Sequence, residues 1–264
     1  MIKYSDIPHK KIKFSIITAV RNGEEFIDQT IKSVIQQDYN LFEYIVVDGK
    51  SSDSTLSIAK KYSNRIAHLI SESDRGISDA FNKGVELATG EYILILNADD
   101  RLIHQSVLSD IAKLISDNDF PLLVYGDAEL VDRNTDEKVA YVSRTLSKNA
   151  LKFGKIIPHP SLFTHRDYFK DFGYFDLTYK VAMDYEWLLR GALKVTSLHT
   201  PFLVTKVRSG GLSAVNSDLG GREITRALQK NNFYSSIFEE LLIVGYFKAR
   251  KNLKKILITL GLKK

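Results

Sequence analysis

Residues 44–53 read YIVVDGKSSD, an apolar run that passes directly into turn-forming and polar residues. The run predicts a buried strand at Tyr44–Val47 that stops at Asp48. Asp53 is a favoured N-cap residue, and the apolar spacing after it predicts a helix that ends near Tyr62. A buried strand, a short polar loop and a helix form the repeating unit of α/β proteins.

The same alternation occurs on both sides of this unit. Apolar runs predict three further strands, at Phe14–Val20, Ile66–Ile70 and Tyr92–Leu96, and helical spacing predicts helices at Glu25–Gln37 and Gly76–Ala88. Strands that are apolar throughout and alternate with helices indicate an α/β fold. We therefore expect a mostly parallel sheet that is covered by helices on both faces.

After residue 100 the pattern becomes a mixed α+β one. We expect helices at Val107–Ile115, Arg166–Asp171 and Met183–Ala192, a hairpin at Ala128–Val142, and short strands at Leu122–Tyr125, Val195–His199 and Leu203–Val207. No linker rich in Pro or Ser divides the chain. We expect one compact domain at residues 1–220, with halves at 13–100 and 101–220, and a helical tail at 221–264.

The composition excludes several classes of protein. The 264 residues are 44% hydrophobic and 26% charged, as in globular domains with a sizeable core. Without cysteine the chain has no disulfide, thiolate nucleophile or Cys-ligated metal. Its longest apolar stretches are far shorter than the roughly 20 residues of a membrane span. The N-terminus has no signal-peptide pattern, so we expect a cytoplasmic protein.

The positive charge is concentrated in the tail. Residues 248–264 hold seven basic residues and no acidic one, although the whole chain has a net charge of only +5. The rest is therefore slightly acidic, which argues against nucleic acid as a partner. Apolar residues recur between these basic residues and from Phe233 onward, which predicts an amphipathic helix on an anionic membrane surface. Packing on the domain and a homodimer interface are the alternatives.

Polar residues follow four of the predicted strands, at the edge where ligands bind to parallel sheets. These groups are Thr18–Asn22, Asp48–Asp53, Glu72–Gly76 and Asn97–Asp100. Adjacent carboxylates repel each other unless a cation joins them, so Asp99 and Asp100 predict a Mg²⁺ or Mn²⁺ site. Nearby cations suit a diphosphate; they are Arg21, Lys50, Arg75 and Lys83. For single residues, a helix cap or a turn is the structural alternative to a role in ligand binding. The sequence contains neither a P-loop nor a Gly-x-Gly-x-x-Gly dinucleotide fingerprint.

Four motifs in this order carry a family resemblance. They are FSIITAVRN at 14–22, IVVDGKSSDST at 45–55, SESDRGISDAFNKG at 71–84 and LNADD at 96–100. Together they resemble the family 2 glycosyltransferases of the GT-A fold, and most closely the bacterial enzymes that build capsule, colanic-acid-type or lipopolysaccharide chains. The resemblance extends over about residues 13–215.

The resemblance implies that residues 13–100 bind a nucleotide-sugar donor. Its nucleobase would contact Thr18, Ala19, Val20, Arg21, Asn22 and Asp48, and its ribose, diphosphate and sugar would contact Arg75, Asp79, Asn82 and Lys83. The family's Asp-x-Asp motif corresponds to Asn97, Ala98 and Asp99. Asn97 replaces the first carboxylate, so the metal is expected on Asp99 with Asp100.

The second half would hold the acceptor and the catalytic base. Asp184 corresponds to the family's general base, with Glu186 as the competing candidate. His159 corresponds to an acceptor-side histidine, and Arg208, Gly210 and Gly211 to a loop over the diphosphate. The processive Gln-x-x-Arg-Trp signature is absent, which favours the addition of a single sugar.

These features lead to one functional hypothesis with two alternatives. We expect an inverting transfer of one sugar from a nucleoside diphosphate sugar, with UDP as the expected nucleotide, to a lipid-linked or polysaccharide glycan. The enzyme would lie at the inner face of the cell membrane. A nucleotidyltransferase is one alternative, and an inactive sugar- or partner-binding module, which Asn97 would suit, is the other.

Overall fold

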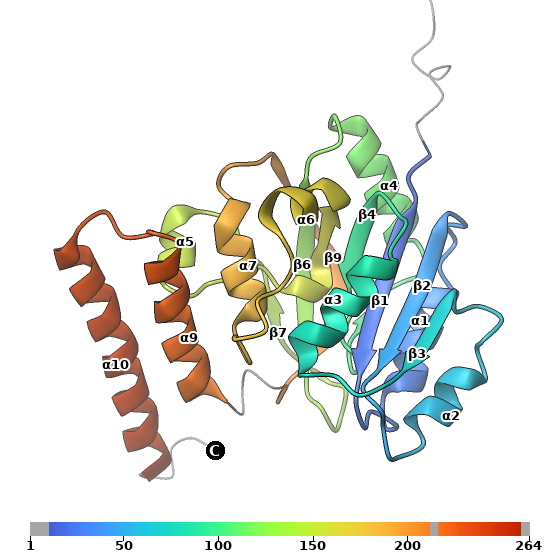
Figure 1. Cartoon of the computed structure of the whole chain (residues 1–264), viewed down its shortest axis with the longest axis horizontal. Coiled ribbons are helices and arrows are strands. Elements are labelled where there is room, and N and C mark those ends of the chain that lie inside the picture. The colour runs from blue at the N-terminus through green and yellow to red at the C-terminus, as the bar shows by residue number, and fades with distance from the viewer. Residues whose placement is uncertain (1–10, 212–215, 260–264) are drawn as a thin grey trace, which may run out of the picture.

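The computed structural model describes residues 11–211 and 216–259, which form one sheet with helices on both faces (Figure 1). The strands are β1 (Phe14–Val20), β2 (Phe42–Asp48), β3 (His68–Ser71), β4 (Tyr92–Ile95), β5 (Arg101–Leu102), β6 (Leu123–Val131), β7 (Lys138–Val142), β8 (Leu162–His165) and β9 (Ser197–Arg208). The helices are α1 (Ile27–Ile35), α2 (Thr55–Lys60), α3 (Ile77–Leu87), α4 (Val107–Asp117), α5 (Lys148–Lys152), α6 (Arg166–Phe172), α7 (Met183–Gly191), α9 (Ser217–Lys230) and α10 (Ile237–Thr259), and a short 3₁₀ helix, η2, covers His159–Ser161.

The strand order β3-β2-β1-β4-β8-β6-β9-β5 divides the sheet into a parallel and a mixed part. β1 pairs in parallel with both β2 and β4, and β2 pairs in parallel with β3. β8 runs antiparallel to β4 and β6, whereas β9 runs parallel to β6. The expected α/β fold, with a mostly parallel first half and a mixed second half, is confirmed.

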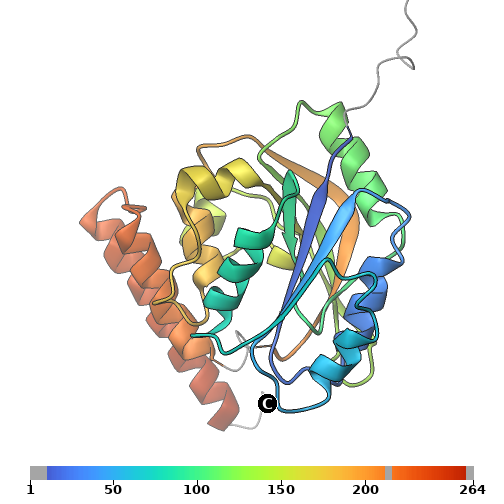
Figure 2. The ribbon, with the colours of Figure 1, turned by 45° about the vertical axis from the view of Figure 1, so that its right-hand side comes forward.

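Alternating side chains of β1 fill two separate cores. Phe14 and Ile16 face a core shared with α1, α2 and α4, whereas Ile17 and Ala19 face a core shared with α3, α6, α7 and α9. A strand that is apolar on both faces must be covered on both, because successive side chains point to opposite sides. Figure 2 shows α3 on one side of the sheet and α1, α2 and α4 on the other.

The second half departs from the prediction in its strands. The predicted strand at 122–125 and the first arm of the hairpin form one strand, β6, and the two predicted strands at 195–199 and 203–207 form the single strand β9. The β6–β9 register shifts around Gly126, where a side chain would collide with Val204 and the Phe202 carbonyl. Sequence patterns cannot distinguish two short strands from one that is locally irregular. The short strand β8 was not predicted.

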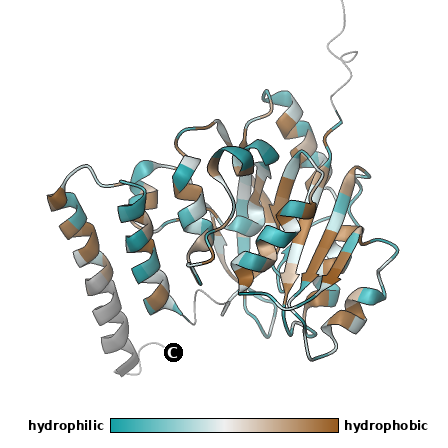
Figure 3. Ribbon diagram, in the orientation of Figure 1, coloured by the Kyte–Doolittle hydropathy of each residue, from teal (hydrophilic) through white to brown (hydrophobic). Residues whose placement is uncertain are grey.

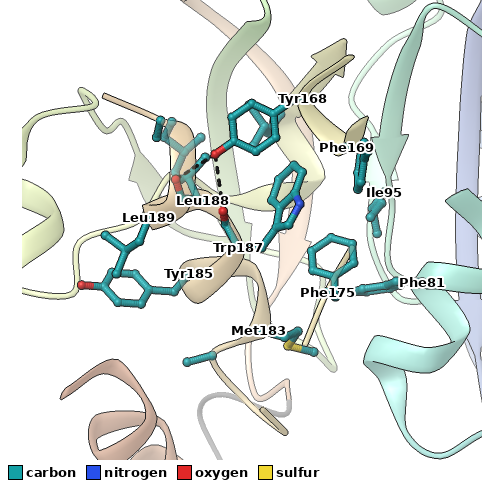
Figure 4. Close-up of a cluster of buried hydrophobic side chains, with 14 of the residues drawn as sticks. Phe81, Ile95, Tyr168, Phe169, Phe175, Met183, Tyr185, Trp187, Leu188 and Leu189 are labelled. Atoms are coloured by element: carbon teal, nitrogen blue, oxygen red, sulfur yellow. Dashed lines mark hydrogen bonds between the residues drawn. The ribbon is translucent and has the colours of Figure 1, made fainter. Parts of the chain in front are cut away.

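Aromatic side chains fix α6 against α7. Trp187 contacts Tyr168, Phe169 and Phe175 at ring-centroid distances of 4.6–5.0 Å, as Figure 4 shows. The Tyr168 hydroxyl donates to the Leu188 carbonyl at 2.9 Å. Buried aromatic groups with satisfied polar atoms restrict movement, so the position of α7 is well defined.

The predicted boundary at residue 220 falls inside α9. Ala227 and Leu228 of this helix are fully buried in the core that also contains α7. The next helix, α10, lies outside α9 (Figure 1), and its first part is largely hydrophobic (Figure 3). Four apolar side chains in this part are exposed: Ile237, Phe238, Leu241 and Leu242. The first helix of the predicted tail is therefore part of the folded domain.

One buried carboxylate ties together the starts of three strands. Glu43 of β2 accepts hydrogen bonds from the Ser15 hydroxyl, the Thr89 amide and hydroxyl, the Gly90 amide and the Lys13 ammonium at 2.6–3.2 Å. Burial alone would raise the pKa of Glu43, but these hydrogen bonds outweigh burial and lower the pKa to about 2. The ionised carboxylate therefore stabilises the fold.

We predict that Glu43→Gln lowers the free energy of unfolding by about 1–3 kcal/mol near neutral pH. Because the folded-state pKa lies below the ordinary value of 4.5, this contribution is complete above about pH 5 and disappears as the pH falls toward 2. Urea unfolding at several pH values measures it, with Glu137→Gln in the exposed hairpin turn as the control. A wild-type–variant difference that stays constant with pH would contradict the assignment.

Candidate functional site

The loops after β1 and β2 are bound to each other at the carboxyl edge of the sheet. The Asn22 amide donates to the Ser51 hydroxyl at 2.8 Å, and the Asn22 side-chain oxygen accepts from the Ser52 amide at 2.9 Å. Asp53, the predicted cap, accepts from the Thr55 and Glu24 amides, although the N-cap position of α2 belongs to the next residue. The two loops therefore form one connected wall.

Asp48 lies at the base of this wall and is fully buried. Its carboxylate accepts from the Ser71 hydroxyl at 2.6 Å and from the Ser51 amide at 3.2 Å. The next residue, Gly49, allows a close approach, because a Cβ atom there would lie 2.2 Å from an Asp74 carboxylate oxygen. Gly49 therefore allows the loop after β3, which carries Asp74, to pack closely against the loop after β2.

The residues predicted before and around this wall differ in their access to solvent. The side chains of Thr18, Ala19 and Val20 are buried, and the Thr18 hydroxyl accepts from the Tyr44 hydroxyl at 3.0 Å. The side chain of Arg21 is exposed. Of these residues, Arg21 is thus the one whose side chain extends into solvent at the edge of the sheet.

The polar residues predicted on α3 form a network of their own. Arg75 binds Asp79 at 2.7 Å, and Lys83 lies 2.7 Å from Glu72 and 3.7 Å from Asp79. The hydrogen bond from Arg75 lowers the pKa of Asp79. Asn82 points elsewhere, because its amide group exchanges two hydrogen bonds with the Phe175 backbone at 2.9 Å. Asn82 therefore joins α3 to the segment after α6.

The two aspartates after β4 have different surroundings. Asp100 is 1% exposed, and its oxygens accept from the Asn97 side-chain amide at 2.8 Å and from the Arg208 backbone amide at 3.0 Å. Burial and, second, the charge of Asp99 raise the pKa of Asp100. Asp99 is 26% exposed and forms an ion pair with Arg133 at 2.8 Å. Asp99 is therefore the accessible carboxylate of the pair.

These surroundings define how the predicted Mg²⁺ or Mn²⁺ would fit. Within residues 11–211 and 216–259, no three carboxylate or imidazole groups converge on one point. Both oxygens of Asp100 have partners already, whereas the Asp99 carboxylate faces the edge of the sheet. A cation held by Asp99 and by phosphate oxygens of a ligand matches the ligation that Mg²⁺ commonly adopts.

His159 joins the end of β4 to the start of α7. It precedes β8, which runs antiparallel to β4, so it lies beyond the carboxyl end of β4 beside Asn97. Its Nε2 is 3.1 Å from Asn97 Oδ1, and its Nδ1 is 3.2 Å from Asp184 Oδ2. The hydrogen bonds form an unbroken line that runs from Asp100 through Asn97 and His159 to Asp184.

This line requires a particular distribution of protons. The side-chain amide group of Asn97 donates a hydrogen bond to Asp100, so the side-chain oxygen of Asn97 faces His159. This oxygen can only accept, so His159 Nε2 carries a hydrogen and donates to it. At the other end of the line, His159 Nδ1 faces Asp184 Oδ2 at 3.2 Å. Both side chains lie on the wall of a small cavity of about 20 Å³, lined mainly by apolar side chains.

Glu186, the competing candidate, is 0% exposed and lies away from this line. It forms ion pairs with Arg190 and, at 3.0 Å, with Lys230 of α9. Arg190 also donates to the Phe172 and Tyr174 carbonyls. A carboxylate enclosed by two cations stabilises the contact between α7 and α9 rather than facing a ligand.

The predicted loop residues at the end of β9 and after it differ in their surroundings. The side chain of Arg208 is 4% exposed, binds Asp136 at 2.9 Å and lies over the ring of Phe26, which makes it part of the hairpin support. Gly210 has a φ of +83°. At both Gly210 and Gly211, an added Cβ atom would have no atom of the described residues within 4 Å. The rest of the predicted loop, Leu212 and Ser213, lies outside the described residues.

Two residues near this site were not found by sequence reasoning. Arg133 appeared only as part of a hairpin turn, and nothing in its spacing indicates a contact with Asp99. Glu223 fell inside the predicted tail, yet its carboxylate accepts from the Lys180, Val181 and Ala182 amides, each at 2.8 Å, directly before α7. A carboxylate that caps a helix from a distant segment leaves no local pattern.

Comparison with known proteins identifies the family. A family model described as Glycosyl transferase family 2 matches residues 15–172. A PGL/p-HBAD biosynthesis glycosyltransferase of Mycobacterium tuberculosis is 31% identical over 211 residues, which are 79% of this chain and 78% of the relative.

Two solved structures are similar in fold. One is S. aureus TarS in complex with UDP-GlcNAc, with a TM-score of 0.67, 20% identity and coverage of 89% of this chain and 71% of that chain. The other is the mannosyltransferase PcManGT from Pyrobaculum calidifontis in complex with GDP-Man and Mn²⁺, with a TM-score of 0.63, 17% identity and coverage of 90% and 69%. The sequence match, the shared fold and the ordered motifs agree, and the chain belongs to glycosyl transferase family 2.

Proposed function

We propose that this glycosyltransferase moves a single sugar, with inversion, from a nucleoside diphosphate sugar to a lipid-linked or polysaccharide glycan. One observation carries the proposal: hydrogen bonds connect Asn97, next to the accessible carboxylate of Asp99, through His159 to Asp184. An acid–base group is thereby held at a fixed position relative to the end of β4. Inverting transfer requires a base at a defined position, because the base and the leaving diphosphate act on opposite sides of one sugar carbon.

The proposed donor is a UDP-sugar bound along the carboxyl edge of β1, β2 and β4. The similar TarS structure contains UDP-GlcNAc, and the similar PcManGT structure contains GDP-Man and Mn²⁺. In this chain Asp48 would accept from the nucleobase, and Arg21, Arg75, Asp79 and Lys83 would surround the rest of the donor. Mg²⁺ or Mn²⁺ held by Asp99 would stabilise the negative charge of the departing diphosphate.

Asp184 is the proposed general base. In its ionised form it accepts the proton of the acceptor hydroxyl while that oxygen bonds to the anomeric carbon and the bond to the diphosphate breaks. His159 orients the Asp184 carboxylate through the contact between Nδ1 and Oδ2. The step uses one base and one displacement and forms no covalent enzyme intermediate.

A panel of UDP- and GDP-sugars, incubated with an acceptor glycan and with or without Mn²⁺, tests the reaction class. We expect release of a nucleoside diphosphate, and a loss of about 10²-fold or more in turnover for Asp99→Ala. Asp117→Ala, an exposed aspartate at the end of α4, is the control and should keep full activity. Release of pyrophosphate from nucleoside triphosphates would indicate the nucleotidyltransferase, and binding without any turnover would indicate the inactive module.

The base assignment has its own test. We expect Asp184→Asn to lower kcat by roughly 10²-fold or more with little change in donor affinity, because a general base acts in the transition state. Glu186→Gln should instead lower the thermal stability, since Glu186 is buried between two cations. If the folded Glu186→Gln enzyme loses turnover and Asp184→Asn retains it, the base has been misassigned.

We also propose that α10 attaches the enzyme to an anionic membrane at the inner face of the cell. Four apolar side chains at the start of this helix are 58–79% exposed, and the sequence continues with seven basic residues and no acidic one. Among the described helices, none combines the length and hydropathy needed to cross a bilayer. An apolar face followed by basic residues suits the surface of a bilayer that carries a lipid-linked acceptor.

Sedimentation with phosphatidylglycerol vesicles tests this attachment. We expect binding at low salt that weakens at high salt, because each basic residue near an anionic surface contributes about 1 kcal/mol. A chain that ends at Phe247 lacks all seven basic residues and should lose most of the binding. Equal sedimentation of the two chains, or none by either, would refute the attachment; a concentration-dependent dimer without vesicle binding would assign the apolar face to a second copy.

A further inference from the structure

Arg133 lies in the turn between β6 and β7, outside every motif on which the proposed function depends. Its Nη1 donates to Asp99 Oδ2 at 2.8 Å, and its guanidinium lies 4.6 Å from the centroid of the Phe26 ring. Asp99 is also the accessible carboxylate that is expected to hold the metal. The protein therefore supplies a positive charge of its own beside this carboxylate.

The turn that carries Arg133 is firmly attached to the sheet. The Arg133 amide donates to the Ser209 hydroxyl at 3.2 Å, and its carbonyl accepts from the Arg208 guanidinium at 3.3 Å. Asp136, three residues further on, forms ion pairs with both Arg101 and Arg208. These contacts fix the main chain of Arg133, so its side chain starts from a defined point next to Asp99.

The Arg133 guanidinium has further hydrogen-bond donors available for a ligand. It carries five N–H donors, and among the described residues its side chain makes one hydrogen bond, to Asp99. The nearest second carboxylate, Glu25, is 3.8 Å away. Since the Arg133 side chain is 38% exposed, the remaining donors are accessible to an anion, and their planar arrangement matches phosphate oxygens.

The ligands that this chain offers to a divalent cation are correspondingly few. Asn97 contributes no charge, and the Asp100 carboxylate is buried with both of its oxygens hydrogen-bonded. Of these three residues Asp99 remains, and one of its oxygens already binds Arg133. A metal at this site gains less from the protein than it would between two free carboxylates, and a diphosphate depends more on other cations.

We propose that Arg133 binds the diphosphate of the nucleotide and takes over part of the charge neutralisation that the metal would supply. This inference rests on the proposed function. Nucleoside diphosphates then bind to the enzyme without divalent metal, and the metal contributes little further affinity while Arg133 is present. Removal of Arg133 converts nucleotide binding from metal-independent to metal-dependent.

Calorimetric titration of the full chain with UDP, and separately with GDP, in EDTA and in Mn²⁺ tests the proposal. We expect the wild-type dissociation constants in the two media to agree within a few-fold. Arg133→Gln should weaken binding in EDTA by about 10-fold or more, the equivalent of one charge-assisted hydrogen bond, and Mn²⁺ should restore most of it. Arg133→Lys, which keeps the charge, should lie between the two.

Lys138→Gln is the matched control, because Lys138 lies on the same hairpin but contacts the Tyr141 ring instead of Asp99. It should bind as the wild type does. Unchanged binding of Arg133→Gln in EDTA overturns the proposal, as does an equal loss in both media, since Mn²⁺ would then not replace the lost charge. A wild type that binds neither nucleotide in either medium, with an unchanged melting curve, overturns the proposed function itself.

Discussion

The pairing of β1 with both β2 and β4 is the constraint on which the site depends. All seven residues of β1 are buried, so the strand can only lie in the middle of a sheet covered on both faces. Parallel neighbours bring the ends of β1, β2 and β4 to one edge, where Asp48 and Asn97 lie. Because β8 is antiparallel to β4, the residue before it, His159, reaches the same edge from the second half of the chain.

The polar groups at this edge fall into two kinds. Asp100, Glu186 and Arg208 are buried and paired within the protein, so they position other residues. Asp99 and Asp184 are partly exposed; Asp99 contacts Arg133, and Asp184 contacts His159. Burying a charge is costly unless it is fully paired, so Asp100, Glu186 and Arg208 form the support, whereas Asp99 and Asp184 are available to a ligand.

The parallel half of the fold could be predicted because its information is local. Each strand is a continuous apolar run, and the positions of Asp48, Asn97 and Asp99 follow from where those runs end. In the mixed half, the helices α4, α6 and α7 and the hairpin could be predicted for the same reason, but the extent of the strands could not, because a bulge at Gly126 and the short strand β8 depend on contacts with distant segments. The contact of Arg133 with Asp99 could not be predicted for the same reason, because it forms only when the hairpin packs against β9.

Glu223 has a consequence for the order in which the enzyme becomes complete. It binds the three amides before α7 from α9, whereas the edge of the sheet that carries Asp48 and Asn97 is built from earlier residues. During synthesis the first half of the chain emerges before α9 exists. The start of α7, with Asp184, then lacks its cap, so in a growing chain the residues that follow β1, β2 and β4 are present before the helix that carries Asp184 can be anchored.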